Sequence, residues 1–213
     1  MKIASASLLS LLVASVLCAA EPRSSSHELR LVQPGRVLVS DDFTQTVRPG
    51  RRLTRGEWTV TGGLASVAHD EELFKKYKNH GPAVWYDQEF GDGLVRFDFQ
   101  PSKDCKHFVF TVNGKAGHVF RFVMNETGSD IRAWDADHKG KQLAKAGPAL
   151  PKGSWTSVTV EMVGDKACVH IGNDYRVVVE DASYAAPKTV VGVSFHYGNV
   201  KLRNFELVEA TPK

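Results

Sequence analysis

The stretch that decides the fold class is Leu94–Gln100, which reads Leu-Val-Arg-Phe-Asp-Phe-Gln. Apolar and polar side chains alternate along it one by one. Because successive side chains of a β-strand point to opposite faces of the sheet, this pattern predicts a strand with one buried and one exposed face. The buried set is Val95, Phe97 and Phe99, and the exposed set is Arg96, Asp98 and Gln100.

The same period of two runs through most of the chain. Residues 108–112, 118–124 and 157–162 alternate strictly. In 118–124 the alternation puts His118 on the same face of the strand as Phe120, and Arg121 on the opposite face. Turn residues such as Gly91-Asp92-Gly93 separate the runs, and no helical segment recurs between them. Many short strands with this spacing predict an all-β fold, an antiparallel sandwich or barrel.

One segment breaks the alternation. Residues 69–80 are rich in charge, with acidic residues at the start and lysines near the end. This distribution suits the dipole of a short helix, and a solvated loop is the alternative. Because binding residues collect on excursions between strands, His80 at the end of this segment is a candidate site residue.

The N-terminus has the order of a secretory signal. Lys2 precedes an apolar run from Ile3 to Val16, and small residues stand just before Glu21. We expect cleavage after Ala20 and a secreted or periplasmic protein. The run is too short to span a bilayer, so the chain is not expected to be membrane-spanning. The domain organisation predicted is a signal at 1–20, a flexible leader at 21–36 and one β-sandwich domain at 37–210.

Charge and cysteine content exclude some partners. The 213 residues carry a formal net charge of +3, and removal of the signal with Lys2 lowers it to +2. Nucleic-acid binding needs a concentrated basic face, so no nucleic-acid partner is expected, and a neutral sugar fits this charge better than a polyanion. Removal of Cys18 leaves Cys105 and Cys168, which an oxidising compartment would allow either to pair or to stay free.

Most catalytic signatures are absent from the sequence. It has no Gly-x-Ser-x-Gly elbow, no phosphate loop, no His-Glu-x-x-His and no Glu-x-Asp-x-x-Glu strand of the retaining glucanases. The best metal-like segment is 135–140, where Asp135 and Asp137 offer hard oxygen ligands beside His138. A turn is the alternative for this segment, with Lys139 placing a cation among the ligands.

The polar faces of the strands suit a sugar. Charged side chains there can bind hydroxyl groups, and an exposed tryptophan can stack on the face of a sugar ring. A plain solvated sheet face is the alternative. The candidate substrate-binding residues are Arg96, Asp98, Arg132 and Trp134.

Several motifs together resemble a known family. They are Asp41-Asp42-Phe43, Gly56-Glu57-Trp58 with the turn Gly62-Gly63, the segment His80-Gly81-Pro82-Ala83, Gly117-His118-Val119-Phe120-Arg121, Trp134-Asp135-Ala136-Asp137-His138 and Gly153-Ser154-Trp155. The chain resembles the secreted 3-keto-disaccharide hydrolase-like domains, a family of formerly unknown function. It resembles them as a short variant, without their Asn-Ser-Gly and Glu-x-Gln strands. The resemblance covers nearly the whole mature chain and implies a concanavalin A-like jelly roll.

The resemblance also implies a chemistry. A 3-keto group acidifies the neighbouring C–H of a sugar, so a base and a cationic group can cleave the glycosidic bond without two carboxylates. It assigns the catalytic roles to His80, His138 and Arg121: a histidine as the base and Arg121 as the stabiliser of an enolate oxygen. Asp135 and Asp137 would hold a divalent metal ion.

Two functions therefore remain. The favoured one is a hydrolase or lyase that cleaves 3-keto-glycosides. The other is a non-catalytic module that binds carbohydrate or another surface. In either case the expected partner is a neutral or oxidised oligosaccharide.

Overall fold

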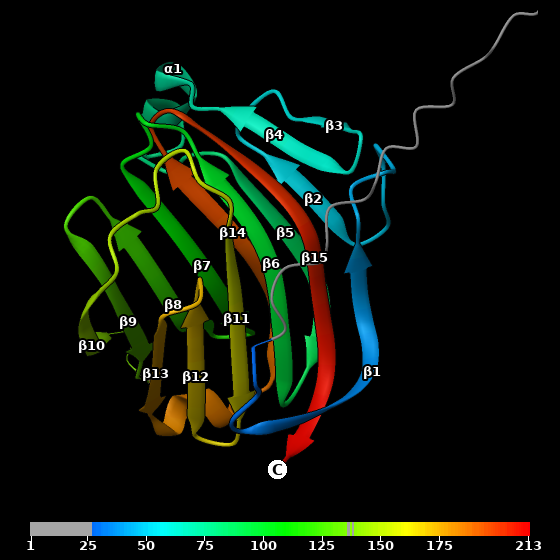
Figure 1. Cartoon of the computed structure of the whole chain (residues 1–213), viewed down its shortest axis with the longest axis vertical. Coiled ribbons are helices and arrows are strands. Elements are labelled where there is room, and N and C mark those ends of the chain that lie inside the picture. The colour runs from blue at the N-terminus through cyan, green and yellow to red at the C-terminus, as the bar shows by residue number, and fades with distance from the viewer. Residues whose placement is uncertain (1–26, 136, 138) are drawn as a thin grey trace, which may run out of the picture.

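A computed structural model describes residues 27–135, 137 and 139–213. Within these residues the chain forms two antiparallel sheets that pack face to face (Figure 1). The sequence prediction of a concanavalin A-like β-sandwich is confirmed. The expected signal at 1–20 lies outside the described residues.

The first sheet, named here the β6/β15 sheet, has the strand order β13-β12-β11-β6-β15-β4-β3, with β1 also paired to β15. Figure 1 looks onto its outer face. Its strands are β1 (Val32–Asp41), β3 (Thr59–Thr61), β4 (Leu64–Ala68), β6 (Gly93–Pro101), β11 (Thr156–Val163), β12 (Lys166–Ile171), β13 (Tyr175–Glu180) and β15 (Asn199–Pro212). Because β1 begins at Val32, regular structure starts ahead of the boundary at 37 that the sequence suggested.

The second sheet, named here the β7/β14 sheet, has the order β10-β9-β8-β7-β14-β5-β2. Its strands are β2 (Arg51–Thr54), β5 (Ala83–Phe90), β7 (His107–Gly114), β8 (Gly117–Asn125), β9 (Gly128–Trp134), β10 (Gly140–Gly147) and β14 (Lys188–His196). The short 3-10 helix η1 (Ala182–Ala185) leads into β14.

The excursion near residue 70 contains the helix α1 (Glu71–Lys76), as the charge distribution predicted. The side chain of Asp70 caps it by accepting the N–H of Leu73 at 2.8 Å. Its Phe74 is buried and contacts the ring of His196, with ring centroids 5.0 Å apart. This contact brings the end of the helix, and with it His80, to one end of the β7/β14 sheet.

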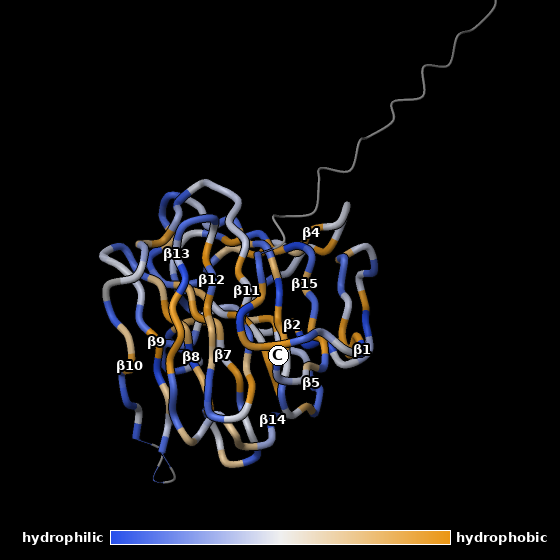
Figure 2. Tube along the Cα trace, turned by 60° about the horizontal axis from the view of Figure 1, so that its bottom comes forward, coloured by the Kyte–Doolittle hydropathy of each residue, from blue (hydrophilic) through white to orange (hydrophobic). Residues whose placement is uncertain are grey.

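The core between the sheets is built from the apolar positions of the alternating strands, as the hydropathy along each trace shows (Figure 2). Aromatic rings stack across it, for example Phe99 on Phe108 with centroids 4.1 Å apart. A buried ion pair joins the sheets at one edge, where Arg51 Nη1 lies 2.9 Å from Asp41 Oδ2. Tyr86 donates its hydroxyl to the same carboxylate, and burial raises the pKa of Tyr86 well above its usual range. This core leaves the polar positions of both sheets on outer faces.

Candidate functional site

The outer face of the β7/β14 sheet carries a small recess. One row of directly paired residues crosses this sheet, one from each strand. Arg121 of β8 lies near the middle of this row, and Trp85 of β5 lies three strands away. The recess there has a volume of about 150 Å³, smaller than a drug-sized pocket. The residues that line this Arg121 recess are Arg55, His80, Gly81, Trp85, Thr111, Asn113, His118, Arg121, Ser194 and His196.

A chain of hydrogen bonds orients the Arg121 guanidinium. Its Nη2 donates to Nε2 of His118 at 2.7 Å, and Nδ1 of His118 lies 2.7 Å from Oδ1 of Asn113. These partners assign the ring tautomer, since Nδ1 must carry the proton in order to donate to the amide oxygen. Burial lowers the pKa of Arg121, and the charge of Arg132 adds to the effect. Nε of Arg121 is buried with no hydrogen-bond partner among the described residues.

A β-bulge places His118 in this chain. The pairing of β7 with β8 shifts at Val119, because Val112 faces Phe120 whereas the next residue, Asn113, faces His118. Both Val119 and Phe120 are therefore buried. The strict alternation predicted from the sequence, which grouped His118 with Phe120, is wrong at this one step. The bulge turns His118 to the face of Arg121.

Two glycines permit the close packing of the recess walls. A Cβ on Gly192 would lie 2.2 Å from the carbonyl oxygen of Val84 and 2.7 Å from the ring of Trp85. A Cβ on Gly81 would lie 2.0 Å from the carbonyl oxygen of Phe195. Only glycine fits at such approaches, so Trp85 lies across β14 and the His80–Gly81 turn lies against it.

Two imidazoles at this end of the sheet have lowered pKa values. His196 stacks on His107 with ring centroids 5.1 Å apart, and burial together with neighbouring cationic groups lowers the pKa of His196 to about 4. Burial also lowers the pKa of His107. His80 is exposed, and its Nδ1 lies 2.9 Å from the carbonyl oxygen of Tyr77. Because that nitrogen must carry the proton, Nε2 of His80 is the nitrogen able to accept one.

The structure brings some of the predicted site residues together. His80 and Arg121 line the same recess. Trp134 lies beside them, with the Arg121 guanidinium 5.3 Å from its ring centroid. Arg132 faces Arg121 across the β8–β9 pairing and forms an ion pair with Asp130 at 2.8 Å.

Other predicted residues lie elsewhere. Arg96 and Asp98 belong to β6 and so to the opposite sheet, where Arg96 lies 3.6 Å from Glu206 and Asp98 3.2 Å from Arg203.

Asp135 closes the turn after β9, where its Oδ1 accepts the backbone N–H groups of Asp137 and Lys139. The side chain of Asp137 is exposed, 3.9 Å from the Lys139 ammonium. His138 lies outside the described residues. Among the residues that line the recess, neither of these two aspartates occurs.

Several recess residues were missed by the sequence reasoning. Arg55, Trp85, Asn113, His118 and His196 are not among the site residues that the sequence predicts. His196 and Asn113 stand at polar positions of alternating strands, which was an available signal. Arg55 and the bulge at Val119 leave no comparable signal in a single sequence.

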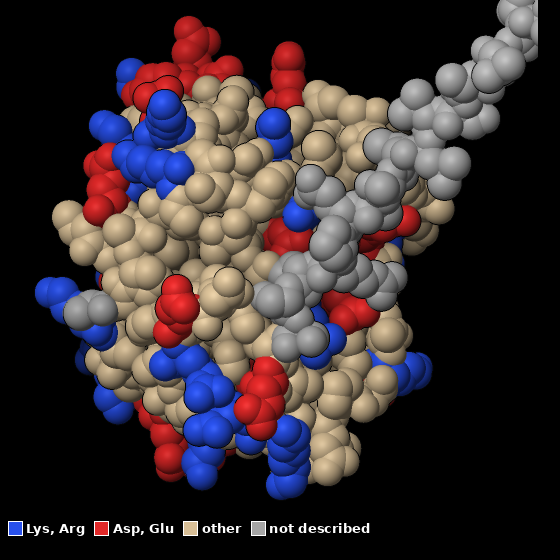
Figure 3. All heavy atoms as spheres, in the orientation of Figure 1, with Lys and Arg blue, Asp and Glu red and all other residues tan. Residues whose placement is uncertain are grey.

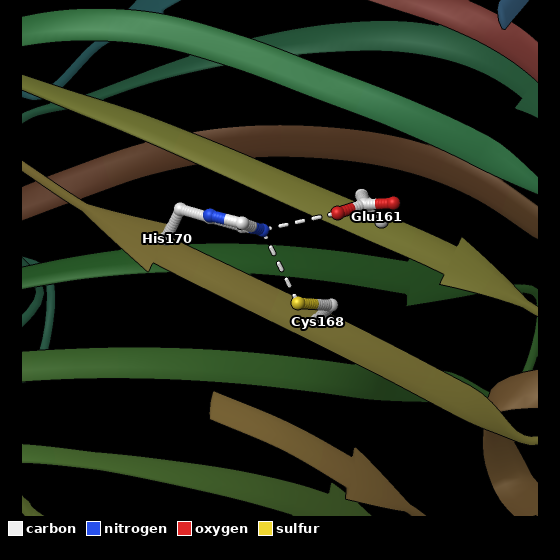
Figure 4. A group of neighbouring side chains, drawn as sticks. All are labelled: Glu161, Cys168 and His170. Carbon is white, nitrogen blue, oxygen red and sulfur yellow. Dashed lines mark hydrogen bonds and ion pairs between the residues drawn. The ribbon is translucent and has the colours of Figure 1, made fainter. Parts of the chain in front are cut away.

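A second cluster lies on the other sheet (Figure 4). The side chains of Glu161, Cys168 and His170 are buried, their ligand-type atoms lie within 4.8 Å of one another, and such groups can hold a metal ion. His170 Nε2 lies 3.1 Å from Glu161 Oε1 and 3.3 Å from Cys168 Sγ. Burial raises the pKa of Cys168 to about 12, so this thiol is protonated near pH 7.

The Glu161 carboxylate already has other partners. It accepts the backbone N–H groups of Arg30, Leu31 and Val32 at 2.7 to 3.2 Å. The carboxylate therefore fixes the segment that precedes β1 on the outer face of the β6/β15 sheet. This hydrogen bonding gives the cluster a structural role in the folded chain.

The sequence left open whether the two cysteines form a disulfide, and in the structure both are free. Cys105 and Cys168 are both buried and unbridged. Burial raises the pKa of Cys105 to about 11, so this thiol is also protonated near pH 7.

Comparison with known proteins identifies the fold of the chain and assigns it to no family. No family model matches the chain, and no curated protein matches its sequence. Solved structures match its shape. The carbohydrate-binding CBM2 module of the evolved Dit protein of Lactobacillus casei BL23 phage J-1 has a TM-score of 0.64 at 10% identity, over 85% of this chain and 98% of that one.

Two further structures show the same relation. The β-glucanase of Bacillus licheniformis has a TM-score of 0.61 at 11% identity, covering 83% of this chain and 99% of that one. The carbohydrate binding module CBM66 of Bacillus subtilis has a TM-score of 0.57 at 9% identity, covering 75% and 96%. These likenesses establish the sandwich fold, which hosts several functions, and the site must supply the rest. Among the described residues, neither helix is long and apolar enough to cross a membrane.

Proposed function

We propose that the protein is carbohydrate-active and binds an oligosaccharide across the outer face of the β7/β14 sheet, with the Arg121 recess as the central subsite. The observation that carries this proposal is the oriented chain from Arg121 through His118 to Asn113 beside the Trp85 ring. Fixed guanidinium and amide groups next to an aromatic ring are what a sugar needs, since its hydroxyls take hydrogen bonds and its C–H face stacks.

The surface around the recess supports a ligand longer than one sugar. A neighbouring groove of about 430 Å³ shares Asn113 and His118 with the recess, and Trp134 lines its wall. The similar structures named above include two carbohydrate-binding modules and a glucanase, and they support the same class of ligand.

Binding is tested by calorimetry on a panel of oligosaccharides with the wild type and Arg121→Met. Arg36→Met is the matched control, because Arg36 lies on the other sheet in an exposed pair with Glu209. We expect Arg121→Met to weaken binding at least about tenfold and Arg36→Met to leave it unchanged. The proposal fails if the folded wild type binds no glycan, or if both variants bind like the wild type.

Cleavage of 3-keto-glycosides is the second candidate function. One observation favours it: His80 and Arg121 line the same recess, and no carboxylate lines it. An unprotonated imidazole can take the acidified C–H proton, and a guanidinium can stabilise the enolate oxygen. The enolate then expels the glycosyloxy group, which takes up a proton and leaves as the alcohol, and water adds to the enone that remains. Two-carboxylate chemistry has no groups among the described residues that line the recess. Asp135 is engaged in its turn, so we propose the step without a metal ion from that segment.

The enzyme is tested with 3-keto-trehalose, with and without a chelator, by following product release. The expected result is release that survives the chelator and falls at least about a hundredfold in His80→Gln or Arg121→Met. If the folded wild type binds the substrate and releases no product under either condition, the protein is a binding module.

A further inference from the structure

The ionisable side chains that line the Arg121 recess are all basic. Of the residues that the structure describes, two arginines and three histidines line it, and no aspartate or glutamate does. Other arginines of the same sheet are paired, since Arg52 lies 2.6 Å from Asp87 and Arg132 lies 2.8 Å from Asp130. The absence of a carboxylate among the lining residues is therefore a property of the recess.

Arg55 is held there against its backbone preference. Its φ is 58°, in the left-handed region that an arginine rarely adopts. Its Nε donates to the carbonyl oxygen of Gly81 at 2.6 Å, and burial lowers its pKa. A cation removed from water in a strained conformation costs free energy that a bound anion would offset.

The hydrogen-bond inventory of the recess also points to an acceptor. The guanidinium groups of Arg121 and Arg55 only donate, and Nε of Arg121 still has no partner among the described residues. Oδ1 of Asn113 is already taken by His118. A neutral sugar hydroxyl has a proton to donate, and the acceptors it finds here are the hydroxyls of Thr111 and Ser194 and the unprotonated imidazole nitrogens, such as Nε2 of His80. A carboxylate or a sulfate has only oxygens that accept, and it matches the fork geometry of arginine.

We propose that the recess binds a sugar unit through an oxyanion substituent, a carboxylate or a sulfate ester, held by Arg121 and Arg55. This inference rests on the proposed function and narrows its ligand. The Trp85 ring lies against the sugar, and the substituent occupies the space between the two guanidinium groups. The low net charge of the chain is no obstacle, because the field that matters is that of a partly desolvated pocket.

The test uses ligands that differ only in charge. Calorimetry compares oligogalacturonates with their methyl esters, and sulfated galactan oligosaccharides with the desulfated forms, at about 50 and about 500 mM NaCl. We expect at least one charged form to bind about tenfold or more tightly than its neutral counterpart, and to lose that advantage at high salt. The series that shows the preference tells carboxylate from sulfate.

Variants connect the preference to the recess. Arg121→Met and Arg55→Met should remove the charge preference, Arg121→Lys should keep part of it, and Arg36→Met should leave it intact. Thermal unfolding of each variant checks that it is folded.

Each other outcome has a distinct meaning. Equal or tighter binding of the neutral forms overturns this inference and leaves the proposed function standing. Binding of free sulfate or acetate at Arg121, without any preference for a sugar, overturns the proposed function instead. No binding by the folded wild type to any probe overturns both.

Discussion

The two outer faces of the sandwich each carry an arginine stacked on a tryptophan, and the two pairs differ in one respect. On the β6/β15 sheet the Arg203 guanidinium lies 4.2 Å from the ring centroid of Trp155, and its Nε donates to the buried carboxylate of Asp98. On the β7/β14 sheet Arg121 lies over Trp134, and its Nη2 donates to the ring of His118. A carboxylate completes the first pair, and the second is left able to bind one.

The difference extends over both faces. Charges of both signs intermix on the outer face of the β6/β15 sheet (Figure 3), and Glu161 fixes the segment before β1 there. Among the described residues that line the Arg121 recess there is no aspartate or glutamate. We therefore infer that the charged side chains of the β6/β15 face stabilise the fold, whereas the arginines of the recess are able to bind a ligand. The predictions below test this division.

The largest expected effect is on stability, at Glu161. Glu161→Ala leaves His170 and the backbone N–H groups of Arg30 and Leu31 without their acceptor in a buried place. We expect the free energy of unfolding to fall by about 3–5 kcal/mol, measured by urea denaturation, with glycan binding unchanged. Glu206→Ala, which removes a half-buried partner of Arg96, should cost less than about 1 kcal/mol. Similar losses in the two variants would contradict a structural role for the buried carboxylate.

The second effect depends on pH and on His196. Its pKa in the folded protein is about 4, against 6.5 in an ordinary histidine, so the unfolded chain takes up the proton first as the pH falls. Stability is complete above about pH 6.5 and is lost between pH 6.5 and 4, by at most about 3 kcal/mol. Urea denaturation across this range measures the loss, and His196→Gln should flatten the profile. An unchanged slope in the variant would remove His196 as the cause. The groups that hold the pKa down besides burial are His107, His69, His80 and Arg55.

How far the sequence can predict this site depends on how far apart the paired strands lie along the chain. The alternation in Leu94–Gln100 correctly predicted β6, and the polar parity of Arg121 correctly placed its side chain on an outer face. Which of two outer faces a strand contributes to depends on its partners, and β7 pairs with β14 some eighty residues later. Arg96 and Arg121 therefore looked alike in the sequence and lie on opposite sheets.

Net charge alone is a weak guide to the ligand of this site. The net charge of the chain predicts a neutral ligand, but it averages over pairs such as Arg52 with Asp87 that cancel locally, so the neutral ligand stays a prediction beside the anionic one proposed above. Only the folded structure shows where cations lack such a neighbour. The bulge at Val119 is likewise visible only in the folded structure. One unpaired residue moves His118 to the face of the sheet that carries Arg121.

A matched pair of substitutions, Arg203→Met and Arg121→Met, tests the opening comparison directly. Arg203→Met withdraws a partner from the buried Asp98, which Asn204 alone then serves, and should lower the free energy of unfolding by about 2 kcal/mol. Arg121→Met removes a partly buried cation that has no carboxylate partner, and should leave stability unchanged or raise it by up to about 1 kcal/mol. Chemical denaturation measures both. If Arg121→Met is the more destabilising change, the recess is a structural feature and the division between the faces is wrong.

The smallest effect separates the two tryptophans. A guanidinium stacked on an indole contributes about 0.5–1 kcal/mol at an exposed site, and a phenyl ring retains part of it. Trp155→Phe should therefore lower the free energy of unfolding by a few tenths of a kcal/mol to about 1 kcal/mol and leave glycan affinity alone. Trp134→Phe should do the reverse and weaken binding a few-fold at constant stability, because Arg121 over Trp134 is positioned for a ligand rather than for a carboxylate of the chain. Glycan affinity by calorimetry and stability by denaturation are measured on both variants. If Trp134→Phe changes only stability, the Trp134 ring has a structural role like that of Trp155 with Arg203.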